Sequence, residues 1–342
     1  MYALAAALFY ALNVQCSKLL LNEISPTFMA ALLYLGAGMG VGIMYTFHHE
    51  SEKQEERLTM KDLPYTVGMI LLDIIAPILL MIGVKYSTSS NASLLGNFEI
   101  AATTVIAFIL FREKVSKRLW TAIGLITLSS IVLTFEGSGS FDFSVGSLLV
   151  LGAAACWGLE NNCTRRISGK STYQIVTIKG LFSGSGALIT AMLLGEEMPE
   201  ISIIPAALAL GFVAYGLSIF TYIRAQKTLG AAKTSAYYAA APFVGAFLSF
   251  VLLKEKLSAG YAAALIIMIL GTAFVVRDTL SHKHSHEHSH TFTHTHDGTT
   301  HTHTIVHSHQ HEHCFTDEKH SHHHSTPELE RYLTGHQSGG AV

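Results

Sequence analysis

Ten apolar segments, separated by short polar connectors, fill residues 2–276 of the chain. A helix needs about 20 residues to cross the hydrocarbon core of a membrane, and an open strand cannot satisfy its backbone there. The pattern therefore predicts an all-α polytopic membrane protein with ten transmembrane helices. They are expected at residues 2–21, 27–47, 65–84, 90–111, 119–135, 145–163, 174–195, 203–223, 234–253 and 258–276.

The composition agrees with this pattern. Of the 342 residues, 50% are hydrophobic and 13% are charged, whereas a soluble domain carries about 25% charged residues. The four cysteines form no Cys-x-x-Cys pair, so we expect neither a disulfide framework nor a structural zinc site.

Positive charges are distributed unevenly between the connectors on the two sides of the predicted membrane. Thirteen Lys and Arg residues lie in connectors on the side of the N-terminus, whereas three lie on the other side, namely Lys85, Lys254 and Lys256. Because cytoplasmic loops carry the excess of Lys and Arg, both termini are predicted to be cytoplasmic.

The chain contains an internal repeat. Residues 85–134 and 227–276 share 9 of 50 positions at an offset of 142, including a Glu-Lys pair at Glu113-Lys114 and Glu255-Lys256. The first and sixth segments agree at an offset of 147. Since each repeat holds five segments, an odd number, the second must enter the membrane in the opposite sense. Inverted repeats of this kind are typical of secondary transporters, with the substrate site near the midplane between the halves.

These features resemble the EamA-like branch of the drug/metabolite transporter (DMT) superfamily. The resemblance rests on the ten-segment pattern, the two Glu-Lys pairs, the Asn91-Ala92-Ser93 entry to the fourth segment and the Trp157-Gly158-Leu159 stretch of the sixth. It implies a permease, often an exporter, for small organic solutes in the inner or plasma membrane. It also implies five-helix repeats at 1–135 and 145–278, followed by a tail at 279–342. Many members carry an arginine near the position of Leu33, so no role of that charge carries over.

Polar residues inside the predicted helices are the candidates for function, because a charge at the bilayer centre costs about 2.5–3.5 kcal/mol on insertion scales. Glu99 is expected to carry a proton or bind a cationic group, since a desolvated carboxyl is disposed to hold a proton; the alternative is a protonated acid bonded to a neighbouring helix. Glu160 and Lys179 are expected to form a static pair or to line the cavity. The predicted cavity residues are Glu99, Asp73, Asn97, Glu160, Asn161, Lys179 and Asn13.

Four further features have structural interpretations. Gly36, Gly38, Gly40 and Gly42 follow no strand, so they indicate close helix packing rather than a nucleotide loop. Lys18 is expected to be an interfacial anchor near Glu23. The Glu-Lys pairs are expected to cap helices and anchor them at the interface. Tyr222, Tyr237 and Tyr238 are expected to pack rather than to bind a substrate.

The tail has a different composition, with eighteen of the 20 histidines, mostly in a His-x-His alternation. Its Ser, Thr, Glu and Gln spacers predict a disordered segment. Neutral imidazoles suit Zn, Ni, Co and Cu ions, so we expect a metal-binding tail; the alternatives are a pH-responsive polycation and a neutral extension. The expected ligands are His282, His284, His286, His288, His290, His294, His296, His301, His303, His307, His309, His311 and His313.

Three functions remain open at this point. The first is a secondary transporter of small organic solutes, the second a transition-metal transporter fed or regulated by the tail, and the third a membrane-anchored metal sensor or store. An enzyme is not expected and no cofactor is required. The expected partners are membrane lipid, a small-molecule solute and transition-metal ions, with no nucleic acid; a homodimer is an open option.

Overall fold

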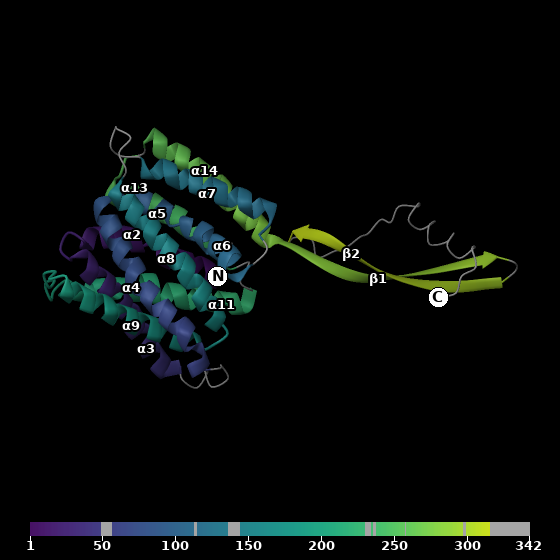
Figure 1. Ribbon diagram of the computed structural model, residues 1–342, viewed down its shortest axis with the longest axis horizontal. Coiled ribbons are helices and arrows are strands. Elements are labelled where there is room, and N and C mark those ends of the chain that lie inside the picture. Colours follow the sequence, from purple (N-terminus) through teal and green to yellow (C-terminus); the bar gives the residue numbers. More distant parts are fainter. Residues whose placement is uncertain are drawn as a thin grey trace. The chain divides into compact units, whose positions relative to one another are not determined.

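The structure is a computed structural model that divides into two compact units, Met1–Thr279 and Leu280–Val342. It describes residues 1–48, 57–112, 115–135, 144–229, 234, 237–256, 258–296 and 299–314. The first unit is a bundle of helices, and the second contains two paired strands (Figure 1).

The first half of the bundle holds the first five predicted transmembrane helices. Two of them are broken, so that each consists of two shorter helices. The elements are α1 (Tyr2–Ala11), α2 (Asn13–Leu20), α3 (Pro26–His48), the 3-10 turn η2 (Met60–Asp62), α4 (Leu63–Tyr86), α5 (Ser89–Leu95), α6 (Phe98–Phe111) and α7 (Lys117–Thr134).

The second half repeats this order. Its third rod contains a π-helical turn, η3, between two α-helices. The elements are α8 (Val145–Ile167), α9 (Thr172–Leu193), α10 (Ile204–Gly211), η3 (Phe212–Leu217), α11 (Ser218–Leu229), α13 (Ala241–Leu253) and α14 (Ala259–Leu280).

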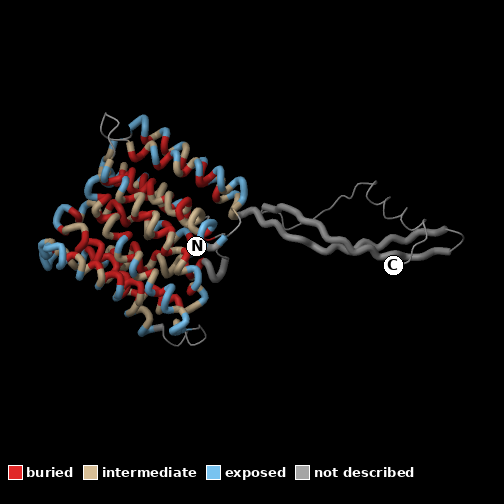
Figure 2. The backbone as a smooth tube through the Cα atoms, in the orientation of Figure 1, coloured by how far each residue is buried: buried red, intermediate tan, exposed pale blue. Residues whose placement is uncertain are grey.

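The predicted all-α membrane fold is confirmed. Seven helical rods within the described residues are long and apolar enough to span a membrane, and α13 is a shorter apolar helix. The other two predicted spans correspond to α7 and α8. Large apolar side chains such as Leu71, Phe182 and Ile266 are exposed. Buried positions gather in the interior of the bundle, and exposed positions lie along its periphery (Figure 2). This distribution suits a surface in contact with lipid.

Helix contacts follow the predicted duplication. Helix α4 packs on α8, and the equivalent pair α11 and α1 also packs together. Helix α3 packs on its own counterpart α9, and α7 lies beside its counterpart α14 (Figure 1). Exchanging the two halves therefore maps these helix pairs onto one another, as a pseudo-two-fold relation requires.

Individual hydrogen bonds repeat as well. The Gln15 Nε2 atom donates to the Gly245 carbonyl at 2.6 Å, and the Asn162 Nδ2 atom donates to the Thr103 carbonyl at 3.2 Å. These bonds are equivalent at the offsets of 147 and 142 residues. Arg112 and Lys254, equivalent residues that end α6 and α13, both have left-handed backbones, with φ of 54° and 52°. The repeat is therefore a structural duplication as well as a sequence similarity.

The glycines of α3 pack helices together, as the sequence predicts. Gly36 and Gly40 lie against Leu208 and Phe212 of the eighth rod, whereas Gly38 lies against α9. A Cβ atom on Gly38 would come within 2.5 Å of the Leu181 backbone nitrogen. Alternate glycines therefore face two different helices, and α3 approaches both closely.

Charged side chains from elsewhere in the bundle cap α4 and α5. The Lys18 ammonium donates to the carbonyls of Lys85 at 3.0 Å and Ser87 at 2.7 Å, and also to the Val84 carbonyl, so it caps the C-terminus of α4. This contact adds a specific role to the anchor predicted for Lys18. Glu255 accepts hydrogen bonds from the backbone nitrogens of Ser89 and Ser90 at 2.7 and 2.9 Å, so it caps α5. Glu113 and Lys114 lie outside the described residues.

The tail differs from the sequence prediction. We expected disorder, but β1 (Ser281–His296) and β2 (Thr299–Cys314) pair as an antiparallel hairpin (Figure 1). Two sequence signals were available: a strict period of two, which is that of a strand, and Asp297-Gly298, a dipeptide favoured in two-residue hairpin loops. The disorder prediction considered only the lack of an apolar core and overlooked this pairing.

Replacing Gly38 by alanine is expected to lower the melting temperature of the detergent-solubilised protein. The new methyl group meets backbone atoms of α9, and such overpacking costs about 1–3 kcal/mol. The control is Gly124→Ala in α7, where an added Cβ meets nothing within 4 Å and alanine favours the helix. Equal melting temperatures for the two variants would contradict the close α3–α9 contact.

Candidate functional site

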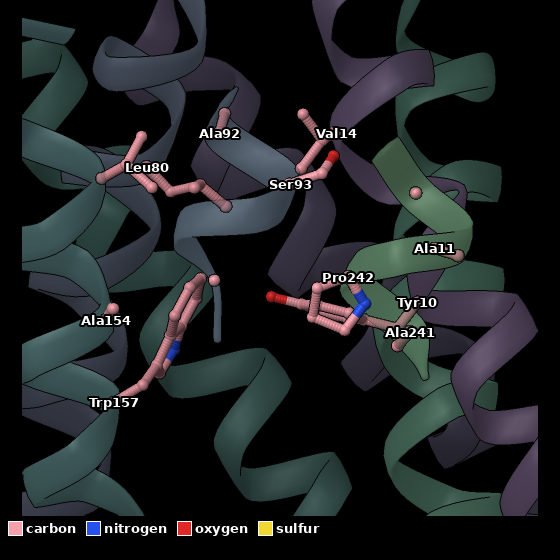
Figure 3. Close-up of a pocket in the computed structure, with 13 residues that line it drawn as sticks. Tyr10, Ala11, Val14, Leu80, Ala92, Ser93, Ala154, Trp157, Ala241 and Pro242 are labelled. Carbon is pink, nitrogen blue, oxygen red and sulfur yellow. The ribbon is translucent and has the colours of Figure 1, made fainter. Parts of the chain in front are cut away.

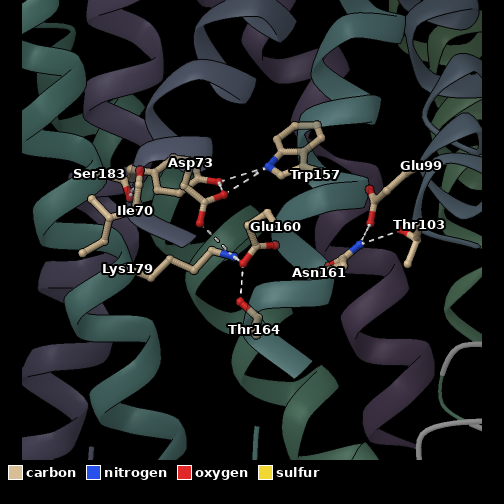
Figure 4. A network of polar contacts seen from close by, with 11 residues as sticks. Ile70, Asp73, Glu99, Thr103, Trp157, Glu160, Asn161, Thr164, Lys179 and Ser183 are labelled. Carbon is tan, nitrogen blue, oxygen red and sulfur yellow. Dashed lines mark hydrogen bonds and ion pairs between the residues drawn. The ribbon is translucent and has the colours of Figure 1, made fainter. Parts of the chain in front are cut away.

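Three charged side chains meet inside the bundle. The Lys179 ammonium of α9 lies 3.0 Å from the Asp73 Oδ2 atom of α4 and 2.9 Å from the Glu160 Oε1 atom of α8 (Figure 4). All three residues are buried. Of the two roles open for Glu160 and Lys179, the structure shows the buried pair, and it adds Asp73 as a third member.

Neutral donors complete this triad. The Tyr34 hydroxyl and the Trp157 Nε1 atom donate to the Asp73 Oδ1 atom at 2.8 and 3.2 Å, and the Thr164 hydroxyl donates to Glu160. With both carboxyls ionised, the triad carries a formal charge of −1. Most of its oxygens are engaged, which favours a fixed arrangement.

Glu99 occupies a second polar cluster on the other side of α8. The Asn161 Nδ2 atom donates to the Glu99 Oε1 atom at 2.6 Å and also lies 3.4 Å from the Thr103 hydroxyl (Figure 4). Glu99 is half-buried, and its Oε2 atom has no hydrogen-bond partner among the described residues. Its carboxyl is therefore less constrained than those of the triad.

The remaining two predicted cavity residues have contrasting surroundings. The Asn13 Nδ2 atom donates to the Tyr215 hydroxyl at 3.0 Å. Asn97 precedes α6 at the break after α5 and is 1% exposed, yet its amide nitrogen and oxygen have no hydrogen-bond partner in the part of the chain described. A buried amide without partners costs about 1–3 kcal/mol, so Asn97 is a candidate for a polar ligand.

A pocket lies between the two halves, beside these clusters (Figure 3). It is partly open, and its cavity volume is small, about 20 Å³. Trp157 stands on one wall, and Tyr10 and Pro242 stand on the opposite wall. The lining also includes Ser93 and Gly96, which immediately precedes Asn97. The pocket therefore borders the broken fourth rod, the kind of element that forms substrate sites in inverted-repeat transporters.

A row of aromatic rings extends from the triad. The Tyr34 ring lies 5.1 Å from that of Tyr215, which lies 6.1 Å from Tyr10. Tyr10 lies 5.9 Å from Tyr238, and Tyr238 lies 4.9 Å from Tyr222. Tyr222 and Tyr238 thus pack with aromatic rings, as predicted, whereas Tyr237 is exposed. The row offers faces on which an organic group can stack.

The charged clusters have neutral counterparts in the other half. At the repeat offsets, Asp73 corresponds to Tyr215 and Glu160 to Asn13, and these counterparts are also hydrogen-bonded to one another. Lys179 corresponds to Leu32, and Glu99 to Ala241. The scaffold is duplicated, but ionisable groups occupy only one of the two equivalent positions.

The structure brings most predicted site residues into two networks, while their roles in function stay predictions. Sequence reasoning missed Tyr34, Trp157, Tyr10 and Tyr215 as members of the site. One signal was available: Tyr10 and Trp157 are equivalent at the offset of 147, and both line the pocket. Among the described residues, no group of three His, Cys, Asp or Glu side chains is arranged to hold a metal; the side chains of the tail histidines lie outside that description.

The family follows from comparison with known sequences. The profile of the EamA-like transporter family matches residues 1–135 and again residues 144–277. The chain therefore belongs to the EamA-like transporter family, and it is a multi-pass membrane protein of the transporter class.

Individual relatives agree with this assignment. An uncharacterized transporter of Methanothermobacter thermautotrophicus is 26% identical over 291 residues, covering 78% of this chain and 83% of its own. The uncharacterized transporter YyaM of Bacillus subtilis is 24% identical over 260 residues, covering 72% and 83%. A protein of known crystal structure aligns with 80% of this chain and 94% of its own, with a TM-score of 0.60 and 18% identity. That last similarity concerns the fold alone.

Replacing Lys179 by methionine is expected to destabilise the protein strongly. Removing one member of a buried ionic group costs about 3–5 kcal/mol because the remaining charge loses its partner. A triple variant, Lys179→Met with Asp73→Asn and Glu160→Gln, is expected to recover part of this loss. Thermal unfolding in detergent measures both.

Lys85→Met is the matched control, because the Lys85 side chain is exposed; its melting temperature should stay at the wild-type value. If the triple variant proves no more stable than Lys179→Met alone, unpaired carboxylates are not the cause of the instability.

Proposed function

We propose that this protein is a secondary transporter, acting as a permease or exporter, that moves small organic solutes across the cytoplasmic membrane by alternating access. The pocket between the halves is the solute site. The family assignment supports the transporter class, and the inverted duplication supports a mechanism in which one half rocks against the other.

Glu99 is the proposed coupling residue. The observation that carries this proposal is the contrast between the two clusters: the triad carboxyls are held by Lys179, whereas Glu99 has one hydrogen-bonded oxygen and one oxygen without a described partner. A carboxyl without a fixed counter-ion can exchange a proton or receive a cationic group. With three carboxyls and one ammonium in the two clusters, the interior favours solutes that carry a positive charge. Nearby aromatic rings can stabilise such a charge.

The proposed orientation places both termini in the cytoplasm. Support comes from the thirteen Lys and Arg residues in connectors on the side of the N-terminus, against three on the other side. The tail then faces the cytoplasm, where intracellular ions and solutes reach it directly.

Metal binding by the tail is the second part of the proposal. The thirteen histidines named above alternate with short polar residues, and neutral imidazole is a ligand for zinc, nickel, cobalt and copper ions. The tail is proposed to buffer or sense such ions. Metal as the transported cargo is the alternative that the following experiments separate from this role.

Glu99→Gln is expected to abolish coupled transport. Glutamine keeps an oxygen that accepts the Asn161 hydrogen bond, but it cannot release a proton. In proteoliposomes with an imposed pH gradient, flux of a panel of radiolabelled organic amines and amino acids should fall to the level of empty liposomes. Expression and melting temperature should stay unchanged.

The matched control is Glu197→Gln, at an exposed position beyond the end of α9, which should transport as the wild type does. Full pH-dependent flux in Glu99→Gln would remove Glu99 as the coupling residue. An absence of flux for every solute and metal tested with the wild-type protein would overturn the transporter proposal.

Deletion of residues 281–342 is expected to separate the tail from transport. The shortened chain keeps α14 intact, so solute flux should be unchanged, while bound zinc and nickel measured by mass spectrometry should fall to background. If the shortened protein alters cellular metal content as strongly as the full chain does, metal is cargo and the organic-solute proposal fails.

A further inference from the structure

The register of the tail hairpin places histidine opposite histidine. Five facing pairs occur along the two strands, four of them at successive alternate positions. The pairs are His282 with His313, His284 with His311, His286 with His309, His288 with His307 and His294 with His301.

All thirteen histidines of the hairpin belong to the same face. In a strand, alternate residues belong to one face, and directly opposite residues of an antiparallel pair share that face. The even-numbered residues of β1 pair with the odd-numbered residues of β2. The sixteen positions of this face hold thirteen histidines with Phe292, Thr299 and Ile305, while the other face holds no histidine.

This arrangement depends on a shift of the histidine alternation by one residue between the two strands. Histidines occupy even positions up to His296 and odd positions from His301 to His313. The change falls at the two-residue connection between the paired residues His296 and Thr299. A continuous alternation through this connection would have placed the histidines of the two strands on opposite faces.

The spacing of such a ladder suits metal ions. Opposite residues have Cβ atoms about 4.5–5.5 Å apart, and successive positions on one face are separated by about 6.7 Å, from a rise of about 3.3–3.4 Å per residue. Two adjacent pairs therefore bring four imidazole-bearing residues to one patch. Zinc binds histidine nitrogens at about 2.0–2.1 Å and is usually four-coordinate, so histidines of such a patch can serve as its ligands.

We propose that the tail hairpin is a cross-strand metal ladder, in which each divalent transition-metal ion is held by histidines of both strands. This inference rests on the proposed metal binding of the tail and specifies how it occurs. The ions bind between the strands rather than along either one, so binding ties β1 to β2.

A phase-shifted variant tests this proposal in the full-length protein in detergent. Exchanging neighbours in β1 keeps the composition and the His-x-His spacing among the four exchanged histidines, but it moves them to the other face. The expected result is a loss of zinc and nickel affinity of about a hundredfold, because ligands from two strands no longer act together. The exchanges are His282→Lys with Lys283→His, His284→Ser with Ser285→His, His286→Glu with Glu287→His, and His288→Ser with Ser289→His.

A compensated variant provides the matched control. It adds the corresponding exchanges in β2, which restore four facing pairs on the opposite face, and it should regain most of the lost affinity. Competition against a chromophoric chelator at pH 7.4 measures all three proteins. The added exchanges are His313→Glu with Glu312→His, His311→Gln with Gln310→His, His309→Ser with Ser308→His, and His307→Val with Val306→His.

The outcomes separate the two proposals. Equal affinity in the wild-type and phase-shifted proteins overturns the ladder while leaving metal binding by the tail in place. A loss without recovery in the compensated variant also overturns the ladder, because pairing is then irrelevant. A wild-type protein that binds neither zinc nor nickel overturns both proposals.

Discussion

The cost of charge in a membrane governs this structure. Lys179 and its two carboxylate partners lie inside a bundle that spans lipid, where an unpaired charge is expensive. The Lys179 ammonium lies between Asp73 and Glu160, so each charge has a partner. This contact joins three helices, α4, α8 and α9, at a single point. The same requirement explains the carbonyl contacts of Lys18 and the helix-capping carboxylate of Glu255.

Duplication supplies the scaffold, while divergence between the repeats supplies the chemistry. Equivalent hydrogen bonds and equivalent helix ends show that the two halves follow one plan. The positions equivalent to Asp73 and Glu160 in the other half nevertheless hold a neutral hydrogen-bonded pair, Tyr215 and Asn13. The interior is therefore asymmetric, although the two halves share one plan.

The tail and the bundle use polar residues under opposite conditions. In the bundle, each ionisable group needs a partner because water is excluded. In the tail, histidines alternate with short polar residues along two paired strands. The register of these strands sets histidine opposite histidine at five positions.

The sequence by itself determined the ten helices, their duplication and the family. Long apolar segments that cross lipid form helices, and the duplication can be read from residues that match at fixed offsets. It also determined which polar residues are exceptional, since Asp73, Glu99, Glu160 and Lys179 interrupt apolar segments. Only the tertiary structure decided their partners. Asp73 contacts Lys179, which lies 106 residues further along the chain, and Glu99 contacts Asn161, 62 residues further along. Local sequence patterns cannot predict contacts between residues so far apart. The hairpin register likewise required the pairing itself, because a period of two describes a strand but not what lies opposite it.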